Sequence, residues 1–160
     1  MSYCFIFTEK VFMKEYDITK SERAFFRIAK NMSDLSDHRY KIGAAVVIKH
    51  RIVSTGTNSD SKCNAHQARL DMATFGGLHF GKMHAETDAL LPLIKNDVDL
   101  TDASLFVYRE HKNKAPAMAR PCERCMKLIK SCGIKTIYYT TEDGVAIEKI
   151  NYKRGTNYEV

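Results

Sequence analysis

The sequence lacks any apolar run near the roughly 18 residues that a membrane-spanning helix needs, so we expect no membrane partner. It also lacks internal repeats and low-complexity tracts, which excludes solenoids and compositionally biased chains. The apolar patch at its start has no basic segment before it and is too short for a secretory signal. With 160 residues, 44% of them hydrophobic and 28% charged, the chain is predicted to fold as one domain.

Cysteine is present in an odd number, which argues against a framework of disulfides. A chain with five cysteines and no secretory signal is expected to keep its thiols reduced, for metal binding or catalysis. We therefore expect a cytoplasmic protein.

Positive charge exceeds negative charge by six at pH 7. Such an excess suits anionic ligands such as nucleotides or nucleic acid, although a generic basic surface is an equally good explanation. The charge is concentrated in one stretch, where eight basic residues stand against two acidic ones, Glu110 and Glu123. The basic residues are Arg109, Lys112, Lys114, Arg120, Arg124, Lys127, Lys130 and Lys135.

The pattern of apolar residues predicts an alternation of helices and strands. We interpret residues 1–15 as an extension, either paired as a strand or loose, of which residues 1–12 are expected to be dispensable. Residues 16–160 are expected to form a single domain. A helix is predicted from Thr19 or Ser21, followed by a hairpin with a tight turn at Lys49–His50.

The second half continues the alternation after a long polar connection, residues 59–83, which contains a short helix predicted at 65–74. Pro92 is expected to kink or end the next helix, and Asp143-Gly144 is a strong hairpin signal. The order αββαβαββ predicts an α/β fold, a three-layer α/β/α sandwich with a mixed sheet of about five strands. The expected strands are 44–48, 51–55, 104–108, 134–140 and 145–150, and the later helices are 84–94 and 122–132.

Two short motifs lie at the predicted starts of helices: His84-Ala85-Glu86, and Pro121-Cys122-Glu123-Arg124-Cys125. Two thiolates three residues apart at a helix N-terminus can bind one metal ion, since the helix end favours their negative charge. The His84 imidazole adds a third ligand. Three protein ligands leave a position for water, which is typical of a catalytic rather than a structural zinc site.

Glu86 lies two residues after His84, in the first turn of the same predicted helix. There its carboxylate can take a proton from water and deliver it to a leaving nitrogen without binding zinc. A redox use of the two cysteines would leave His84 and Glu86 unexplained.

The H-x-E … P-C-x-x-C pattern is the signature of zinc nucleobase deaminases, and the chain resembles the cytidine/deoxycytidylate deaminase superfamily from about residue 23 to 139. The resemblance implies a cytidine deaminase-like fold and hydrolysis of an exocyclic amine with release of ammonia. It makes His84, Cys122 and Cys125 the zinc ligands and Glu86 the catalytic proton shuttle. It further implies a base contact from the backbone N–H of Ala85.

Substrate preference is predicted from two further residues. Asn58, in Gly56-Thr57-Asn58, is similar to the family's G-x-N asparagine, which contacts the sugar or base. Arg120 stands where tRNA adenosine deaminases commonly have glutamate, and with Arg124 it favours an anionic substrate. The predicted antiparallel last strand resembles the branch that acts on free nucleosides. We therefore expect a cytosine nucleotide or nucleoside as substrate, with dCMP favoured.

Two other functions remain open from the sequence. The basic stretch would also suit a deaminase of single-stranded DNA or RNA, and a non-catalytic zinc-binding module would not need Glu86. The family resemblance implies a homo-oligomer. We expect one catalytic zinc and no second, structural zinc, because Cys63, His66 and His79 offer too few ligands at poor spacing.

Overall fold

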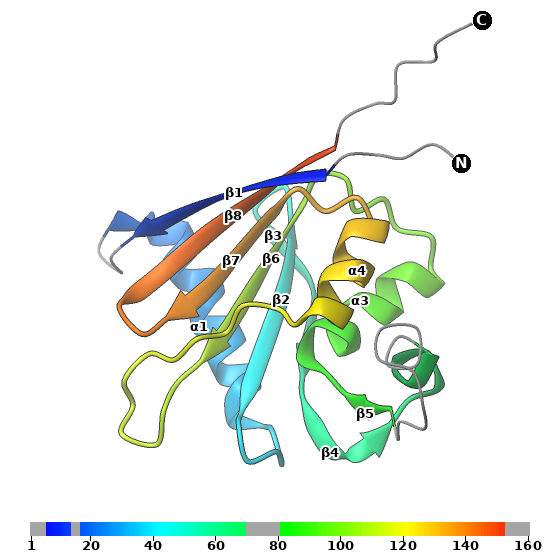
Figure 1. The fold of residues 1–160 in the computed structure, drawn as a ribbon, viewed down its shortest axis with the longest axis horizontal. Helices are drawn as coiled ribbons and strands as arrows, with labels where there is room; N and C mark the ends of the chain where they lie inside the picture. Colours follow the sequence, from blue (N-terminus) through cyan, green and yellow to red (C-terminus); the bar gives the residue numbers. More distant parts are fainter. Residues whose placement is uncertain (1–5, 14–16, 70–80, 153–160) are drawn as a thin grey trace, which may run out of the picture.

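The computed structural model describes residues 6–13, 17–69 and 81–152. Its centre is a six-stranded sheet in the order β1-β8-β7-β6-β2-β3. Helix α1 (Lys20–Asp34) covers one face, and helices α3 (Ala85–Lys95) and α4 (Glu123–Ser131) lie together on the other (Figure 1). The predicted three-layer α/β/α sandwich is confirmed, with one strand more than the five expected.

The sheet is mixed, as predicted: β6 and β7 are parallel and every other neighbouring pair is antiparallel. A separate two-stranded sheet, β4 with β5, occupies part of the long polar connection. The strands of the main sheet are β1 (Ile6–Met13), β2 (Ile42–Ile48), β3 (Arg51–Thr57), β6 (Ala103–Arg109), β7 (Thr136–Thr141) and β8 (Gly144–Tyr152). The short strands are β4 (Ser59–Cys63) and β5 (Lys82–Met83).

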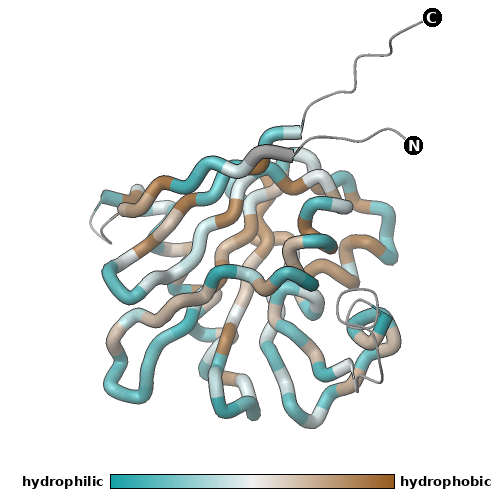
Figure 2. The backbone as a smooth tube through the Cα atoms, viewed as in Figure 1, coloured by the Kyte–Doolittle hydropathy of each residue, from teal (hydrophilic) through white to brown (hydrophobic). Residues whose placement is uncertain are grey.

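Alternation along β6 explains the three layers. Leu105 and Val107 are fully buried in the cluster that includes α3 and α4, whereas Phe106 packs with Phe25 and Phe26 of α1. Successive side chains of a strand point to opposite faces, so β6 contributes to both apolar layers. Figure 2 shows hydrophobic positions along the strands and hydrophilic loops at the lower edge. Among the described residues, no helix is long and apolar enough to cross a membrane.

The predicted hairpin and helix boundaries are largely confirmed. Lys49 and His50 adopt φ values of 47° and 61° in the turn between β2 and β3, as a tight hairpin turn requires. Thr19 is the N-cap of α1 in a full capping box with Glu22. The Asp143-Gly144 turn joins β7 to an antiparallel β8.

Three features differ from or go beyond the expectations. Pro92 neither ends α3 nor interrupts it before Lys95. Most of the other residues of this helix are buried, and that packing outweighs the lost hydrogen bond. The extension contains β1, which pairs with β8 over eight residues. Residues 65–69 are helical, and the rest of the helix predicted at 65–74 falls outside the described residues.

Candidate active site

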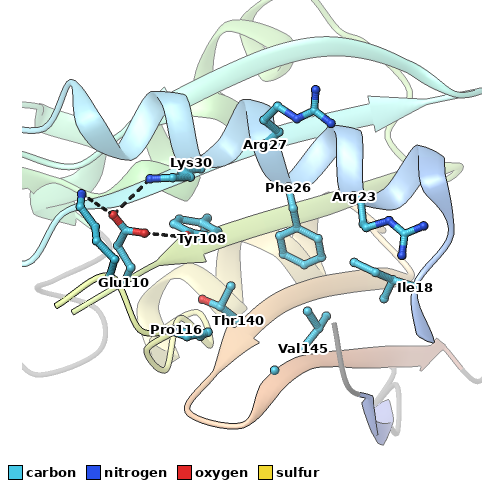
Figure 3. A pocket seen from close by; sticks show the side chains of 12 residues that line it. Ile18, Arg23, Phe26, Arg27, Lys30, Tyr108, Glu110, Pro116, Thr140 and Val145 are labelled. Atoms are coloured by element: carbon cyan, nitrogen blue, oxygen red, sulfur yellow. Dashed lines mark hydrogen bonds and ion pairs between the residues drawn. The ribbon is translucent and has the colours of Figure 1, made fainter. Parts of the chain in front are cut away.

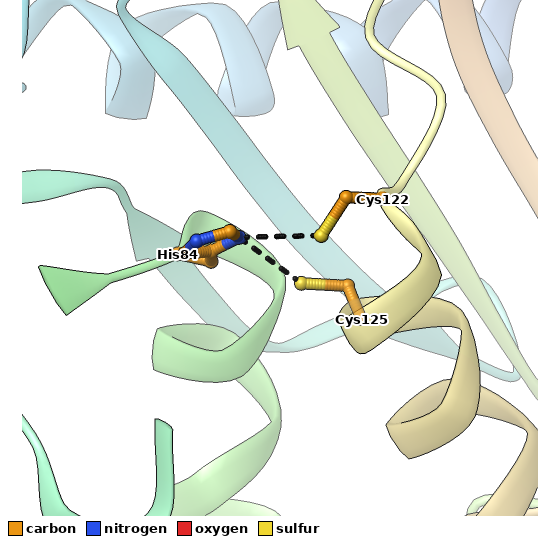
Figure 4. A group of neighbouring side chains, drawn as sticks. All are labelled: His84, Cys122 and Cys125. Carbon is orange, nitrogen blue, oxygen red and sulfur yellow. Dashed lines mark hydrogen bonds between the residues drawn. The ribbon is translucent and has the colours of Figure 1, made fainter. Parts of the chain in front are cut away.

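The two motifs meet because both helices that carry them begin at the same place. His84 is the N-cap of α3 and Cys122 is the N-cap of α4, each in extended backbone conformation. Neither side chain caps its own helix, so both remain available to a ligand. In Figure 4 the imidazole and the two thiols, Cys122 and Cys125, point toward one another across the gap between the helices.

This His-Cys-Cys cluster (His84, Cys122 and Cys125) has the dimensions of a zinc site. Its ligand atoms all lie within 4.8 Å of one another. The Nδ1 atom of His84 is 3.5 Å from Sγ of Cys122 and 3.4 Å from Sγ of Cys125. Tetrahedral zinc, with bonds of about 2.1 Å to nitrogen and about 2.3 Å to sulfur, separates such atoms by about 3.6 Å. The residues therefore fit the metal.

The electrostatics of the cluster favour a divalent cation. A hydrogen bond from Cys125, assisted by His84 and opposed by burial, lowers the pKa of Cys122 to about 3. The same hydrogen bond, together with burial and the charge of Glu86, raises the pKa of Cys125. Only one thiol can ionise easily beside the other acidic groups, and a bound cation would remove that conflict because it stabilises both thiolates.

Glu86 lies beside the cluster and is buried. Only 5% of its surface is exposed, and its Oε2 accepts a hydrogen bond from the Cys125 thiol at 3.6 Å. Burial is the main cause that raises the pKa of Glu86 above its usual range. A carboxyl group with a raised pKa next to a metal site can act both as a general base and as a general acid.

The cluster opens into a cleft of about 530 Å³, a size that suits a small molecule. The cleft contains Glu86, the backbone of the Ala85 turn and several cationic side chains. The cationic residues are Lys82, Arg109, Arg120 and Arg124, and the His38 imidazole also lines the cleft. An anionic substrate is the chemical class that this lining fits best.

Asn58 lines the cleft, but its amide is already engaged. Its Oδ1 accepts hydrogen bonds from the Ser36 hydroxyl and the Ile42 N–H, and its Nδ2 donates to the Tyr40 carbonyl. These contacts tie the end of β3 to the loop that precedes β2. The structure thus gives Asn58 a clear role in positioning the loop, and its contact with a sugar or base stays a prediction.

Arg120 also lines the cleft, and its guanidinium is held by a buried acid. Its Nε and Nη2 donate to the two carboxylate oxygens of Glu148, both at 2.8 Å. Glu148 is fully buried in β8, and its Oε2 also accepts from the Tyr139 hydroxyl at 3.4 Å. Arg120 therefore orients the loop just before Cys122, and its predicted contact with substrate stays a prediction.

The sequence predictions missed Tyr40, Arg109 and Gln67. Tyr40 and Arg109 line the cleft, and Gln67, fully buried, accepts a hydrogen bond from the His84 N–H at 3.4 Å. In the sequence, Arg109 was one of eight basic residues in a single stretch and nothing set it apart. Residues that come together only through tertiary contacts leave no regular spacing in the sequence that could reveal them.

A second cleft, of about 630 Å³, lies between α1 and the sheet, on the face opposite α3 and α4 (Figure 3). Its single carboxylate, Glu110, is bonded by Lys30, Lys114 and Tyr108. None of the His-Cys-Cys ligands lines this cleft, so the chemistry of the motifs belongs to the first cleft.

Three residues of the basic stretch have a carboxylate partner. Lys114, Arg120 and Lys127 form ion pairs with Glu110, Glu148 and Glu123, respectively. Among the residues considered for a second zinc, Cys63 is exposed and His79 lies outside the described residues. The His-Cys-Cys cluster is the one metal-binding group found among residues that the structure describes.

Comparison with known proteins agrees with this geometry. The family profile of the cytidine and deoxycytidylate deaminase zinc-binding region matches residues 19–141. The deoxycytidylate deaminase of Mycobacterium phage D29 is 32% identical over 130 residues, covering 74% of this chain and 92% of that protein. ComE operon protein 2 of Bacillus subtilis is 28% identical over 104 residues, covering 65% of this chain and 50% of that protein.

Solved structures show the same fold. The dCMP deaminase of cyanophage S-TIM5 in its apo form is 25% identical, with a TM-score of 0.54 over 76% of this chain and 84% of that chain. The cytidine deaminase of Burkholderia pseudomallei shares the fold at 19% identity, with a TM-score of 0.52 over 84% of this chain and 93% of that chain. The matched region spans both motifs and the sheet between them, and the chain belongs to the family of zinc-binding cytidine and deoxycytidylate deaminases.

Proposed function

We propose that the protein is a zinc-dependent hydrolytic deaminase that converts a cytosine nucleotide to the uracil nucleotide and ammonia. The favoured substrate is dCMP. The observation that carries this proposal is the His-Cys-Cys cluster with buried Glu86 in one cation-lined cleft. A relative named deoxycytidylate deaminase and a similar structure of a dCMP deaminase in complex with dCMP and dUMP support the choice of substrate.

His84, Cys122 and Cys125 would hold the zinc ion. When bound, zinc supplies a Lewis acid that lowers the pKa of water to about 7. The N-termini of α3 and α4 both face the site, and their partial positive charges stabilise the thiolates.

Glu86 would move the protons of the reaction. Water adds an oxygen to C4 of the pyrimidine while its proton passes to Glu86. Glu86 then delivers this proton to N3. The second proton of the water, which is on the new C4 hydroxyl, passes through Glu86 to the amino nitrogen. The C4–N bond breaks, the C4 carbonyl forms and ammonia leaves. Burial raises the pKa of Glu86, and this makes the carboxylate a better proton acceptor at the start of the cycle and keeps the proton within the site.

Ala85 would contact the pyrimidine through its backbone. It is fully buried in the first turn of α3, where N–H groups have no partner within the helix. That N–H can donate to the carbonyl oxygen of cytosine. Asn58 would contact the sugar or position the loop that does so, and Arg120 would add positive potential near the thiolates. Homo-oligomerisation and a cytoplasmic location stay predictions from the sequence.

The test is ammonia release by the zinc-loaded protein. The panel consists of dCMP, deoxycytidine, CMP, cytidine, adenosine and guanine, together with a cytosine-containing single-stranded oligonucleotide. We expect dCMP to have the highest kcat/KM. Turnover of the oligonucleotide alone would favour a nucleic-acid deaminase instead. If no compound of the panel releases ammonia while one zinc is bound per chain, the result would contradict the proposal and favour a non-catalytic zinc-binding module.

A further inference from the structure

Arg109 is the last residue of β6, and its backbone is rigidly held where the strand meets the cleft. Its N–H donates to Oγ1 of the buried Thr140 at 3.0 Å. The same hydroxyl lies 3.1 Å from the Arg109 carbonyl and 2.8 Å from that of Ala117. These hydrogen bonds hold the backbone at both ends of the loop between Arg109 and Ala117. The backbone position of Arg109, from which its side chain extends, is therefore well defined.

The guanidinium of Arg109 is held as well. Its Nη1 donates to the Met118 carbonyl at 3.2 Å, and its Cζ lies 4.9 Å from the centre of the Tyr40 ring. The Tyr40 backbone donates to Nδ1 of His38 and accepts from Nδ2 of Asn58. An aromatic ring under a guanidinium fixes the plane of the guanidinium, which prepares it for a ligand of matching geometry.

The charge of Arg109 differs from that of Lys82 and Arg120, which line the same cleft. Lys82 is 2.9 Å from Asp60, and Arg120 is paired with Glu148. In the described part of the chain, no carboxylate forms an ion pair with Arg109. Its guanidinium contacts a neutral carbonyl and a ring, and the Glu142 carboxylate interacts with its charge only beyond ion-pair distance. Most of its N–H donors therefore remain for a ligand in the same cleft as Glu86.

We propose that Arg109, oriented by Tyr40, binds the 5′-phosphate of the substrate and so selects a nucleoside monophosphate over the nucleoside. This inference rests on the proposed function, since it assigns the phosphate site of the same cleft. The planar fork of arginine matches two phosphate oxygens. Arg120 cannot offer the same fork, because its Nε and Nη2 are occupied by Glu148.

The first measurement is kcat/KM of Arg109→Ala for dCMP and for deoxycytidine. Loss of a charge-assisted hydrogen bond corresponds to a decrease of roughly ten- to a hundredfold for dCMP. Deoxycytidine, which has no phosphate, should change by less than about threefold. Arg39→Ala is the matched control: Arg39 also contacts the Tyr40 ring, at 5.2 Å, but does not line the cleft.

The second measurement does not need turnover. The wild-type protein should bind dUMP more tightly than deoxyuridine in calorimetry, and Arg109→Ala should abolish that difference. Equal losses with both ligands, or equal effects of Arg39→Ala and Arg109→Ala, would overturn the assignment. If no substrate is turned over but Arg109 still discriminates dUMP from deoxyuridine, the proposed function fails and the phosphate site stands.

Discussion

Among single residues, Glu86 combines burial with a position next to the Cys125 thiol. Glu86→Gln keeps the size of the side chain but removes its ability to carry protons. We expect kcat to fall by about 10²- to 10⁴-fold, while zinc content, measured by atomic absorption, stays at one ion per chain.

Asp88→Asn provides the control for this substitution. Asp88 is a carboxylate in the same first turn of α3, but it accepts a hydrogen bond from the Thr57 N–H and does not line the cleft. Near-normal turnover in Asp88→Asn and loss in Glu86→Gln would assign the effect to proton transfer. Normal turnover in Glu86→Gln would refute the assignment.

Arg120 forms a hydrogen-bonded ion pair with the buried Glu148, and this pair contributes to stability. Glu148 is fully buried and the Arg120 side chain is 35% exposed. Glu148→Gln removes the charge that compensates Arg120, and we expect the free energy of unfolding in urea to fall by about 1–3 kcal/mol. Glu123→Gln, which breaks an exposed ion pair with Lys127, should change it by less than about 0.5 kcal/mol.

The same pair predicts a dependence on pH. Burial opposes the charge of Glu148, but its hydrogen bonds and the Arg120 charge prevail and lower the pKa of Glu148 below its usual 4.5. The pair should therefore stabilise the fold fully above pH 4.5 and lose its effect as the pH falls through the lower, folded-state value. The difference in stability between wild type and Glu148→Gln should shrink in that acid range. A difference that stays constant down to pH 3 would argue against an ionic contribution.

At the scale of elements, β3 packs closely against α3 at Gly56, and this contact determines where the first turn of α3 lies. A Cβ atom on Gly56 would overlap the backbone oxygen of Ala85 and the backbone nitrogen of Ala89. Backbone atoms cannot rotate away, so Gly56→Ala must displace the helix that carries Glu86. We expect a loss of about 1–3 kcal/mol in the free energy of unfolding and weaker zinc retention during dialysis against a chelator.

Ser54→Ala, in the same strand, is the comparison for this substitution. Ser54 is half-buried and lies away from that contact, so stability and zinc retention should stay close to wild type. If Gly56→Ala matched Ser54→Ala in both measurements, the close approach would not be what positions α3.

The elements also show what a sequence can and cannot predict. The hairpin turn at Lys49–His50 and the two motif helices followed from local signals, and the structure confirms them. The start of α1 was predicted at Thr19 or Ser21, and the structure places the N-cap at Thr19. The partnership of Arg120 with Glu148 could not be predicted, because it depends on a loop and a strand meeting in the fold. For the same reason, Arg109 and Tyr40 showed no sign of lying together.

For the whole molecule, the extension can be tested by deletion. β1 covers one edge of the sheet, yet Val11 and Phe12 are 51% and 69% exposed, so these two side chains bury little apolar area. We expect a chain that starts at Met13 to fold, with a lower midpoint in thermal unfolding and a greater tendency to associate, because the edge of β8 becomes unpaired.

Size-exclusion chromatography of the shortened chain would measure the association, and circular dichroism would measure the unfolding. Complete loss of folded protein would show that β1 is essential, contrary to the prediction that residues 1–12 are dispensable. An unchanged elution profile and midpoint would show that β1 contributes nothing to the domain.

The pairing of β1 with β8 joins the first strand of the sheet to the last. On the ribosome, β1 emerges before the other strands of this sheet, and its partner β8 is made only after all the others. Closing so long a loop is slow compared with forming the β2–β3 hairpin. During translation, the two motif helices can therefore pack onto the central strands before this edge is closed, and the N-terminal strand should be the last part of the sheet to assemble.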